Sequence, residues 1–288
     1  PTTGMNDRHN PARLLYDNKD NKYAYWRLFG NAYINLQPIK GLNIKSNFGL
    51  DYTNFFKRNM VHSYVSGTLN NDLSSVTLGE SYATKWTWSN TASYAKKIGV
   101  HDFDVLVGVE MYKEETIDFS AYKDDYLIET PEQMWPDMGI GTSKVTGTAS
   151  GYTLLSYFGK VNYAYDNRYL ASATLRYDGS SRFGKNNRFG TFPAFSVGYR
   201  ISEEAFMEDT KNWLSDLKLR FAWGQTGNQE TSNTAVHTIY VTDYGTGDPT
   251  WTSLNGTSYD LTGKGGTTLP SGYKKTQQGN PDLKWETT

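Results

Sequence analysis

The 288-residue sequence contains no cysteine and no long run of apolar residues. Without cysteine, this stretch of chain has no disulfide, no cysteine-ligated metal and no thiol nucleophile. A transmembrane helix needs about 18 or more consecutive apolar residues, so none is predicted. Only 37% of the residues are hydrophobic, against about 45–50% in a typical soluble protein. This shortage disfavours an α/β enzyme, whose parallel strands are continuous apolar runs.

An excess of either charge is also missing, because 29 Lys and Arg residues nearly balance 30 Asp and Glu residues. We therefore expect no basic surface for nucleic acid. Aromatic residues, in contrast, are abundant, with 22 Tyr, 13 Phe and 8 Trp, and this content argues against disorder. The chain begins Pro1-Thr2-Thr3-Gly4, with neither a methionine nor a signal peptide. We expect it to be an internal piece of a longer polypeptide.

Hydrophobic residues recur with a period of two. From Trp26 to Leu36, apolar and small residues alternate with polar and aromatic ones, and after a turn at 38–41 the alternation resumes as far as Tyr52. One face of such a strand is apolar, and the other carries amides, Lys and Asp. The same pattern predicts further strands over about 82–95, 103–111, 155–165, 169–177, 195–201 and 217–223. Eight strands are thus expected.

Short and long connections alternate between these strands. The predicted turns within hairpins cover 37–41, 96–101 and 166–168, and the longer segment 202–216 holds a one- or two-turn helix that Ser202 could cap. Long loops are expected at 57–81, 114–151 and 225–282, with one of medium length at 178–190. Because long and short connections alternate, the long loops gather at one end of the sheet.

Alternating strands, short turns on one side, long loops on the other and aromatic strand ends are typical of outer-membrane barrels. Lipid cannot hydrogen-bond to backbone, so a sheet that spans a membrane must close on itself. We therefore predict an all-β, antiparallel transmembrane β-barrel segment that is part of a larger barrel. A secreted β-sandwich that binds glycan and a small closed barrel that serves as anchor or adhesin remain as alternatives, and an enzyme is the least favoured class.

Several blocks of sequence resemble the middle of SusC/RagA-type TonB-dependent transporters. The blocks lie in the family's order at 156–163, 168–170, 175–190, 200–207, 213–220, 224–229 and 280–288. Residues 23–53 fit the same family more loosely. The resemblance covers roughly the second half of the chain in register.

This resemblance implies a 22-stranded barrel in the outer membrane of Bacteroidetes that imports oligosaccharide or peptide. It further implies an N-terminal plug, energy from TonB, a SusD-like surface lipoprotein as partner, contact with outer-membrane lipid, and no cofactor. The sequence contains neither plug nor TonB box, so residues 1–288 are expected to form one partial receptor-like barrel domain.

Aromatic and polar residues of the long loops are the candidate ligand-binding groups. Flat aromatic faces can stack on sugar rings while carboxylates and amides hydrogen-bond around them, although the same side chains can simply pack against neighbouring loops. The candidates are Trp135, Asp137, Tyr244, Trp251 and Tyr259.

The residues of the family motifs lie where strands meet loops, and we expect their role to be structural. They are Asp178, Gly179, Ser180, Ser181, Arg182, Phe183, Gly227 and Asn228. Glycine at such a junction permits positive φ, and Asp or Ser can bond nearby backbone amides. The alternative is that Arg182 grips a ligand. No metal site is expected, because His9, His62, His101 and His237 lie far apart and the segment 17–21 reads as a solvated turn.

Overall fold

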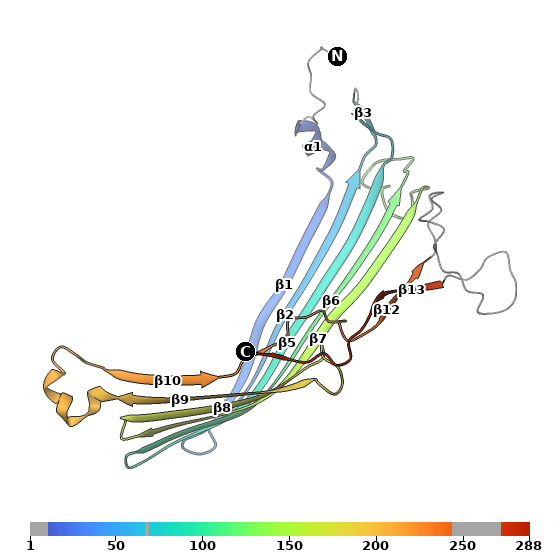
Figure 1. Cartoon of the computed structure of the whole chain (residues 1–288). Coiled ribbons are helices and arrows are strands. Elements are labelled where there is room, and N and C mark those ends of the chain that lie inside the picture. Colours follow the sequence, from blue (N-terminus) through green and yellow to red (C-terminus); the bar gives the residue numbers. More distant parts are fainter. Residues whose placement is uncertain (1–10, 67–68, 244–271) are drawn as a thin grey trace. The chain divides into compact units, whose positions relative to one another are not determined.

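The computed structural model describes residues 11–66, 69–243 and 272–288, and its main element is one eight-stranded antiparallel sheet (Figure 1). The hydrogen-bonded order is β1-β2-β5-β6-β7-β8-β9-β10, so strands that follow one another in the sheet also follow one another along the chain. Their bounds are β1 Lys22–Leu36, β2 Leu42–Val61, β5 Ser75–Ile98, β6 His101–Asp124, β7 Ser143–Tyr165, β8 Tyr169–Ser180, β9 Phe189–Arg200 and β10 Lys218–Gly224. A single sheet in linear order is neither a two-layer sandwich nor a small ring of its own.

Short elements accompany the sheet. Three small pairs of strands are β3 (Tyr64–Ser66) with β4 (Leu69–Asn71), β11 (Gly227–Asn228) with β14 (Glu286–Thr287), and β12 (Ile239–Asp243) with β13 (Gly272–Gln277). Among the described residues, helical structure is limited to α1 (Pro11–Asp17) and the 3₁₀ turns η1 (Ile201–Glu203) and η2 (Ala205–Thr210). None of the helices in the described ranges is long and apolar enough to cross a membrane.

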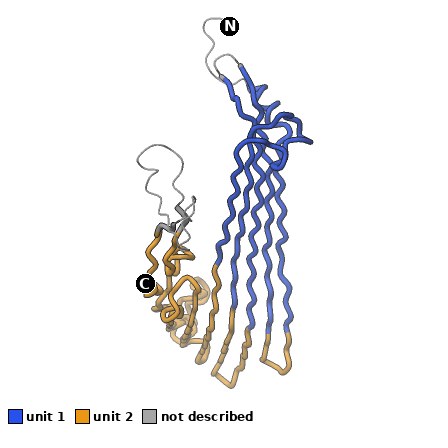
Figure 2. Tube along the Cα trace, turned by 90° about the vertical axis from the view of Figure 1, so that its right-hand side faces the viewer, with its two compact units in different colours: residues 1–35, 45–90, 111–151 blue, residues 36–44, 91–110, 152–288 orange. Residues whose placement is uncertain are grey.

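The chain divides into two compact units (Figure 2). Unit 1 comprises residues 1–35, 45–90 and 111–151, and unit 2 comprises residues 36–44, 91–110 and 152–288. In unit 1, the segments of β1, β2, β5, β6 and β7 run side by side. Unit 2 contains the short turns, all of β8, β9 and β10, and the C-terminal segment.

Four strands are much longer than the sequence pattern indicates. The predicted loops 57–81 and 114–151 are wrong over much of their length, because β2 continues to Val61, β5 begins at Ser75, β6 ends at Asp124 and β7 begins at Ser143. β5 and β6 each have 24 residues, or about 80 Å at a rise of about 3.3 Å per residue. At the start of β7, Ser, Thr, Gly and Lys occupy both faces, while the ladder of hydrogen bonds continues.

The strands of unit 2 have one apolar and one polar face. Residues paired across β7, β8, β9 and β10 share a face. The apolar face carries Tyr157, Val161, Tyr163, Tyr165, Tyr169, Ala171, Ala173, Leu175, Tyr177, Phe195, Val197, Tyr199, Leu219, Phe221 and Trp223. The polar face carries Lys160, Asn162, Ser172, Thr174, Arg176, Asp178, Ser196, Lys218 and Arg220. The apolar side chains are largely exposed (Leu219 68%, Phe221 59%), which fits a face turned toward hydrocarbon.

Aromatic rings mark both ends of this apolar face. Tyr169 and Tyr199 stack at one end with centroids 5.2 Å apart, and Tyr177 and Phe189 stack at the other with centroids 4.7 Å apart. Tyr169 and Tyr177 are about 26 Å apart along the strand, or about 20 Å along the membrane normal at a tilt of about 40°. This height is close to the apolar band of roughly 25 Å, flanked by aromatic girdles, in transmembrane barrels.

The predicted tight turns at 37–41 and 166–168 are present, and the turn after β5 is shorter than predicted, at 99–100. Asp166 and Asn167 both have positive φ, which Asp and Asn tolerate better than most residues. Gly41 has a φ of 89°, and a Cβ there would collide with the carbonyl oxygen of Ala95. Glycine is therefore required at this turn.

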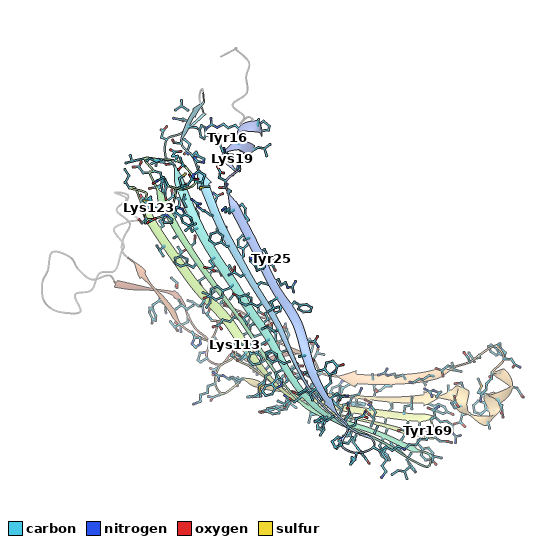
Figure 3. All side chains as sticks on the ribbon, turned by 180° about the vertical axis from the view of Figure 1, so that it is seen from behind. Tyr16, Lys19, Tyr25, Lys113, Lys123 and Tyr169 are labelled. Carbon is cyan, nitrogen blue, oxygen red and sulfur yellow. The ribbon has the colours of Figure 1, made fainter. Side chains whose placement is uncertain are left out.

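The segment after β9 differs from its predicted form. Ser202 does not cap a helix, and its hydroxyl donates instead to Asp216 at 3.1 Å. Glu204 organises the segment: one carboxylate oxygen accepts hydrogen bonds from the hydroxyls of Tyr169 (3.2 Å) and Tyr199 (3.1 Å), and the other accepts one from Arg168 (2.9 Å). The carboxylate thus ties the 3₁₀ turns to the aromatic end of the sheet, where Tyr169 lies (Figure 3).

Stability of this segment should depend on pH through Glu204. Burial alone would raise the pKa of Glu204, but hydrogen bonds from Tyr199 and Arg168 outweigh burial and hold its pKa below the usual 4.5. The stabilisation is therefore complete above about pH 4.5 and is lost as the pH falls through the lower pKa of the folded state. Hydrogen exchange of residues 201–216, corrected for intrinsic rates, should accelerate on acidification. Glu204→Gln should remove this acceleration and Glu203→Gln should retain it, whereas equal behaviour of the two variants would contradict the assignment.

Candidate functional site

One face of the sheet in unit 1 is lined with paired charges, amides and tyrosines. Alternate residues of a strand share a face, so these side chains project from the same side of β1, β2, β5 and β6. The pairs are Arg27 with Asp51 (2.8 and 2.9 Å), Asn31 with Asn47 (3.1 Å), Lys85 with Glu114 (3.2 Å) and the ammonium of Lys45 4.7 Å from the Tyr33 ring centroid. A face of this composition is suited to water and to hydrogen-bonding ligands.

The opposite face of unit 1 is apolar over only part of its length. The rings of Phe48 and Trp86 stack with centroids 6.2 Å apart. On the same face, Lys113 of β6 lies at the level of Trp86 and pairs with Glu115 (2.8 Å; Figure 3), and farther along β2 and β5 Asn54 is hydrogen-bonded to Glu80 (3.1 Å). The appearance of charged residues places the edge of the hydrocarbon near Lys113 and Trp86, because charged groups are costly in lipid.

Beyond this edge, the loop between β6 and β7 folds over the same face and forms a small core. Met60, Val76, Tyr126 and Met134 are buried together, and burial raises the pKa of Tyr126. The neck of the loop is closed by backbone bonds from Ile140 to Asp125 (2.9 Å) and from Gly141 to Asp124 (3.0 Å). The loop is therefore a packed structure with its own hydrophobic centre.

Trp135 belongs to this packed loop. Its ring lies 4.1 Å from the guanidinium of Arg58, and its carbonyl accepts a hydrogen bond from the Tyr126 hydroxyl at 3.1 Å. Arg58 is buried and also donates to the carbonyls of Pro131 and Met134. Asp137 is exposed on the same loop. These contacts explain the position of Trp135 by packing, and contact of Trp135 or Asp137 with a ligand stays a prediction.

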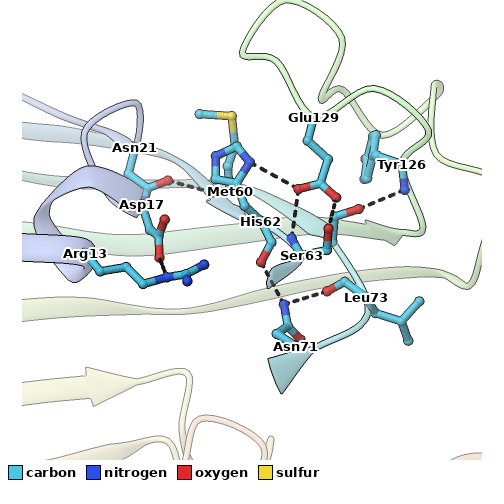
Figure 4. A network of polar contacts seen from close by, with 11 residues as sticks. Arg13, Asp17, Asn21, Met60, His62, Ser63, Asn71, Leu73, Tyr126 and Glu129 are labelled. Carbon is cyan, nitrogen blue, oxygen red and sulfur yellow. Dashed lines mark hydrogen bonds and ion pairs between the residues drawn. The ribbon is translucent and has the colours of Figure 1, made fainter. Parts of the chain in front are cut away.

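A polar network joins the loop between β6 and β7 to the residues that follow β2 (Figure 4). Glu129 accepts hydrogen bonds from the backbone amide (2.8 Å) and hydroxyl of Ser63 and lies 3.4 Å from His62. Asn21 accepts a bond from the amide of Met60 at 2.7 Å, so the turn after α1 is tied to β2. Within the described ranges no group of three or more His, Asp or Glu side chains is arranged to hold a metal ion.

In unit 2, the motif residues 178–183 are held by contacts within the protein. Asp178 pairs with Arg176 (3.0 Å), and the amide of Ser180 donates to the carbonyl of Arg188. A Cβ on Gly179 would meet the ring of Phe189. The amide of Ser181 donates to the carbonyl of Thr153. These contacts account for the junction between β8 and its loop.

Arg182 and Phe183 connect this loop to segments distant in sequence. The guanidinium of Arg182 lies 3.9 Å from the Tyr152 ring and donates to Asn233 (2.7 Å) and to the carbonyl of Gln229 (3.3 Å). Phe183 is buried against the ring of Trp285. Gly227 and Asn228 pair with Thr287 and Glu286. We propose a structural role for these motif residues, and their partners Asn233 and Trp285 were not singled out from the sequence.

A groove of about 420 Å³ on the polar face of unit 1 was also missed by the sequence analysis. It crosses β2, β5, β6 and β7, and we call it the polar-face groove. Its lining includes Phe55, Lys57, Ser81, Asp118, Ser120 and Thr148. Tyr244, Trp251 and Tyr259, the other predicted ligand-binding residues, lie outside the described residues.

Residues 2–288 match the family described as TonB dependent receptor-like, beta-barrel. The chain is 34% identical over 230 residues to the TonB-dependent receptor SusC of Bacteroides thetaiotaomicron. This match covers 71% of this chain and 22% of that protein. It is 28% identical over 290 residues to the TonB-dependent receptor P39 of Formosa agariphila. That match covers 98% of this chain and 25% of the receptor. The chain thus spans about a quarter of the length of these relatives.

Among solved structures, the chain resembles that of the RagAB peptide transporter. The TM-score is 0.76 with 26% sequence identity, and the match covers 94% of this chain and 28% of that one. The two-faced sheet therefore corresponds to a segment of a larger barrel. The chain belongs to the TonB-dependent receptor-like β-barrel family of the bacterial outer membrane, whose members are transporters and not enzymes.

Proposed function

We propose that the protein imports oligosaccharide or peptide across the outer membrane as a SusC/RagA-type transporter. The observation that carries this proposal is the contrast between the two faces of the sheet. One face is apolar over the height of a bilayer, and the other bears paired charges and amides such as Arg27 with Asp51 and Lys85 with Glu114. A membrane wall whose second face is polar fits a hydrated passage for a polar ligand. Similarity to SusC and to the RagAB transporter supports the same function.

The partners and the rest of the barrel belong to this proposal. An open sheet cannot leave its edges in lipid, so we infer that strands outside these residues complete a 22-stranded barrel around a plug. TonB would supply energy through a segment outside the described chain. A SusD-like surface lipoprotein would cover the outer end of the barrel.

Deletion of the gene in its native bacterium tests the function. Uptake of fluorescently labelled oligosaccharides and peptides should be measured with and without a protonophore. We expect deletion to abolish uptake of at least one ligand, the full-length gene to restore it, and the protonophore to stop it. Uptake that is unchanged by deletion, or that continues without an energised inner membrane, would contradict the proposal.

A further inference from the structure

A furrow runs along β8 on the apolar face of unit 2, and we call it the lipid-face groove. Its floor is formed by the small side chains of Ala171 and Ala173, which lie two residues apart and therefore on the same face of the strand. Larger residues paired with them across the sheet form the walls, namely Tyr163 and Val161 of β7 and Val197 and Phe195 of β9. Small residues between two rows of large ones leave a channel along the strand.

The groove consists of two hollows that follow one another along β8. The first, of about 430 Å³, lies over Ala171 and is lined by Tyr199 and Phe221. The second, of about 480 Å³, lies over Ala173 and Gly159. A Cβ on Gly159 would meet only ordinary van der Waals contacts, the nearest at 3.8 Å. The missing side chain at Gly159 therefore widens the second hollow and is not required to avoid a collision.

The polar atoms around the groove are already bonded within the protein. The Tyr163 hydroxyl is hydrogen-bonded with Nδ1 of His101 (2.8 Å), and the hydroxyls of Tyr169 (3.2 Å) and Tyr199 (3.1 Å) donate to Glu204. The backbone of β8 is paired with β7 on one side and β9 on the other. The groove thus presents carbon surface, which suits a flexible hydrocarbon chain.

The length of the groove matches one leaflet of a bilayer. It extends from Tyr169 to Leu175, about 20 Å along the strand and about 15 Å along the membrane normal at a tilt of about 40°. A hydrocarbon core about 30 Å thick gives each leaflet about 15 Å. The Tyr169 end adjoins the short turn at 166–168, and short turns lie on the periplasmic side of outer-membrane barrels. The groove therefore faces the periplasmic leaflet, which consists of phospholipid.

The periplasmic end of the groove fits the headgroup region. Glu204 binds the hydroxyls of two tyrosines of the apolar face, so the 3₁₀ turns that follow β9 lie at this end of that face. The same segment leaves Phe206 70% and Trp213 76% exposed. Tryptophan is enriched where membrane proteins meet the headgroups. The groove thus leads from an interfacial segment into the hydrocarbon.

We propose that the lipid-face groove binds one acyl chain of a phospholipid from the periplasmic leaflet of the outer membrane. The chain lies along β8 over Ala171, Ala173 and Gly159, and the headgroup lies at the level of the stacked rings of Tyr169 and Tyr199 (Figure 3). Lipid tails are as apolar as the side chains that they meet, so selective binding comes from packing of the chain into the hollows. The site does not depend on which ligand the barrel imports.

Filling the groove tests the site in the purified full-length protein. After delipidation in mild detergent, dipalmitoyl phosphatidylethanolamine is added back and bound lipid is counted by native mass spectrometry. We expect Ala171→Leu combined with Ala173→Leu to raise the Kd of the tightest-bound phospholipid by about 5-fold, equivalent to roughly five to ten lost van der Waals contacts. Ala32→Leu makes the same change on the apolar face of β1, lines neither hollow, and should leave this Kd unchanged.

Two further measurements make the test independent of one variant. Gly159→Leu narrows the second hollow alone and should also raise the Kd, once heat-modifiable migration has shown that the barrel is assembled. An equal Kd in the wild type and in the assembled groove variants would overturn the site. Cryo-electron microscopy of the wild-type full-length protein in nanodiscs of the same phospholipid should show continuous chain density along β8. Featureless density there, or a second copy of the protein seated over the groove, would equally overturn it.

Discussion

Ala173→Arg is expected to destabilise the barrel by about 2–4 kcal/mol and to prevent its accumulation in the outer membrane. Ala173 lies on the apolar face of β8, midway between Tyr169 and Tyr177, whose rings mark the ends of the apolar band. Its cross-strand partners, Val161 and Phe195, are apolar as well. An arginine there would meet the hydrocarbon near its midplane, too far from either interface to reach water easily.

The matched control is Ser172→Arg. Ser172 is adjacent in the chain but lies on the polar face between Asn162 and Ser196, where a guanidinium stays hydrated. Heat-modifiable migration and membrane fractionation of the full-length variants provide the readouts. Normal assembly of Ala173→Arg together with failure of Ser172→Arg would mean that the two faces have been assigned the wrong way round.

Arg182→Met is expected to release the loop that follows β10, with a local destabilisation of about 2–4 kcal/mol, because two charge-assisted hydrogen bonds are lost. The Arg182 side chain is 11% exposed. It holds Asn233 and the carbonyl of Gln229 from one side and contacts the ring of Tyr152 on the other. Methionine retains much of the apolar stem but cannot donate. Protease cleavage and hydrogen exchange within 225–237 should therefore increase strongly.

Glu230→Gln is the control for the ion pair of Arg182. Glu230 lies 3.7 Å from the guanidinium but its side chain is 83% exposed, so screening by water should limit the effect to well under 1 kcal/mol. A different result would revive the alternative role of Arg182. Should Arg182→Met leave this loop protected while weakening ligand binding, the guanidinium would be a ligand contact rather than a structural clamp.

The part of the sheet that lies in lipid could be predicted from the sequence alone, because lipid imposes an alternation of apolar and polar residues along each strand. Ile44, Val161 and Leu175 alternate with polar neighbours because one face meets hydrocarbon and the other meets water, and the eight strands follow from that period. Over 143–151, Ser, Thr, Gly and Lys occupy both faces, so this stretch resembles a loop in sequence although it forms strand. Residues 114–124 keep an alternation of Ile117 and Phe119 with Asp118, which was not recognised as strand in the sequence.

The candidate groove was hidden because its residues come from strands distant in sequence. Only the pairing of β2, β5 and β6 brings Lys57 and Asp118 to one face of the sheet. Trp135 was visible as a loop aromatic, but its stacking on Arg58 depends on a strand distant in sequence. Asn233, the partner of Arg182, and Trp285, the partner of Phe183, were missed for a similar reason, since only the fold brings them to these residues.

The self-contained packing of the loop between β6 and β7 affects how this surface can evolve. The loop closes its own neck at Asp124 and Asp125 and buries Tyr126 and Met134 against Met60 and Val76, while Leu127 and Ile128 remain outside at 81% and 56% exposure. Outward positions can therefore vary between strains or lengthen by insertion without disturbing the wall beneath.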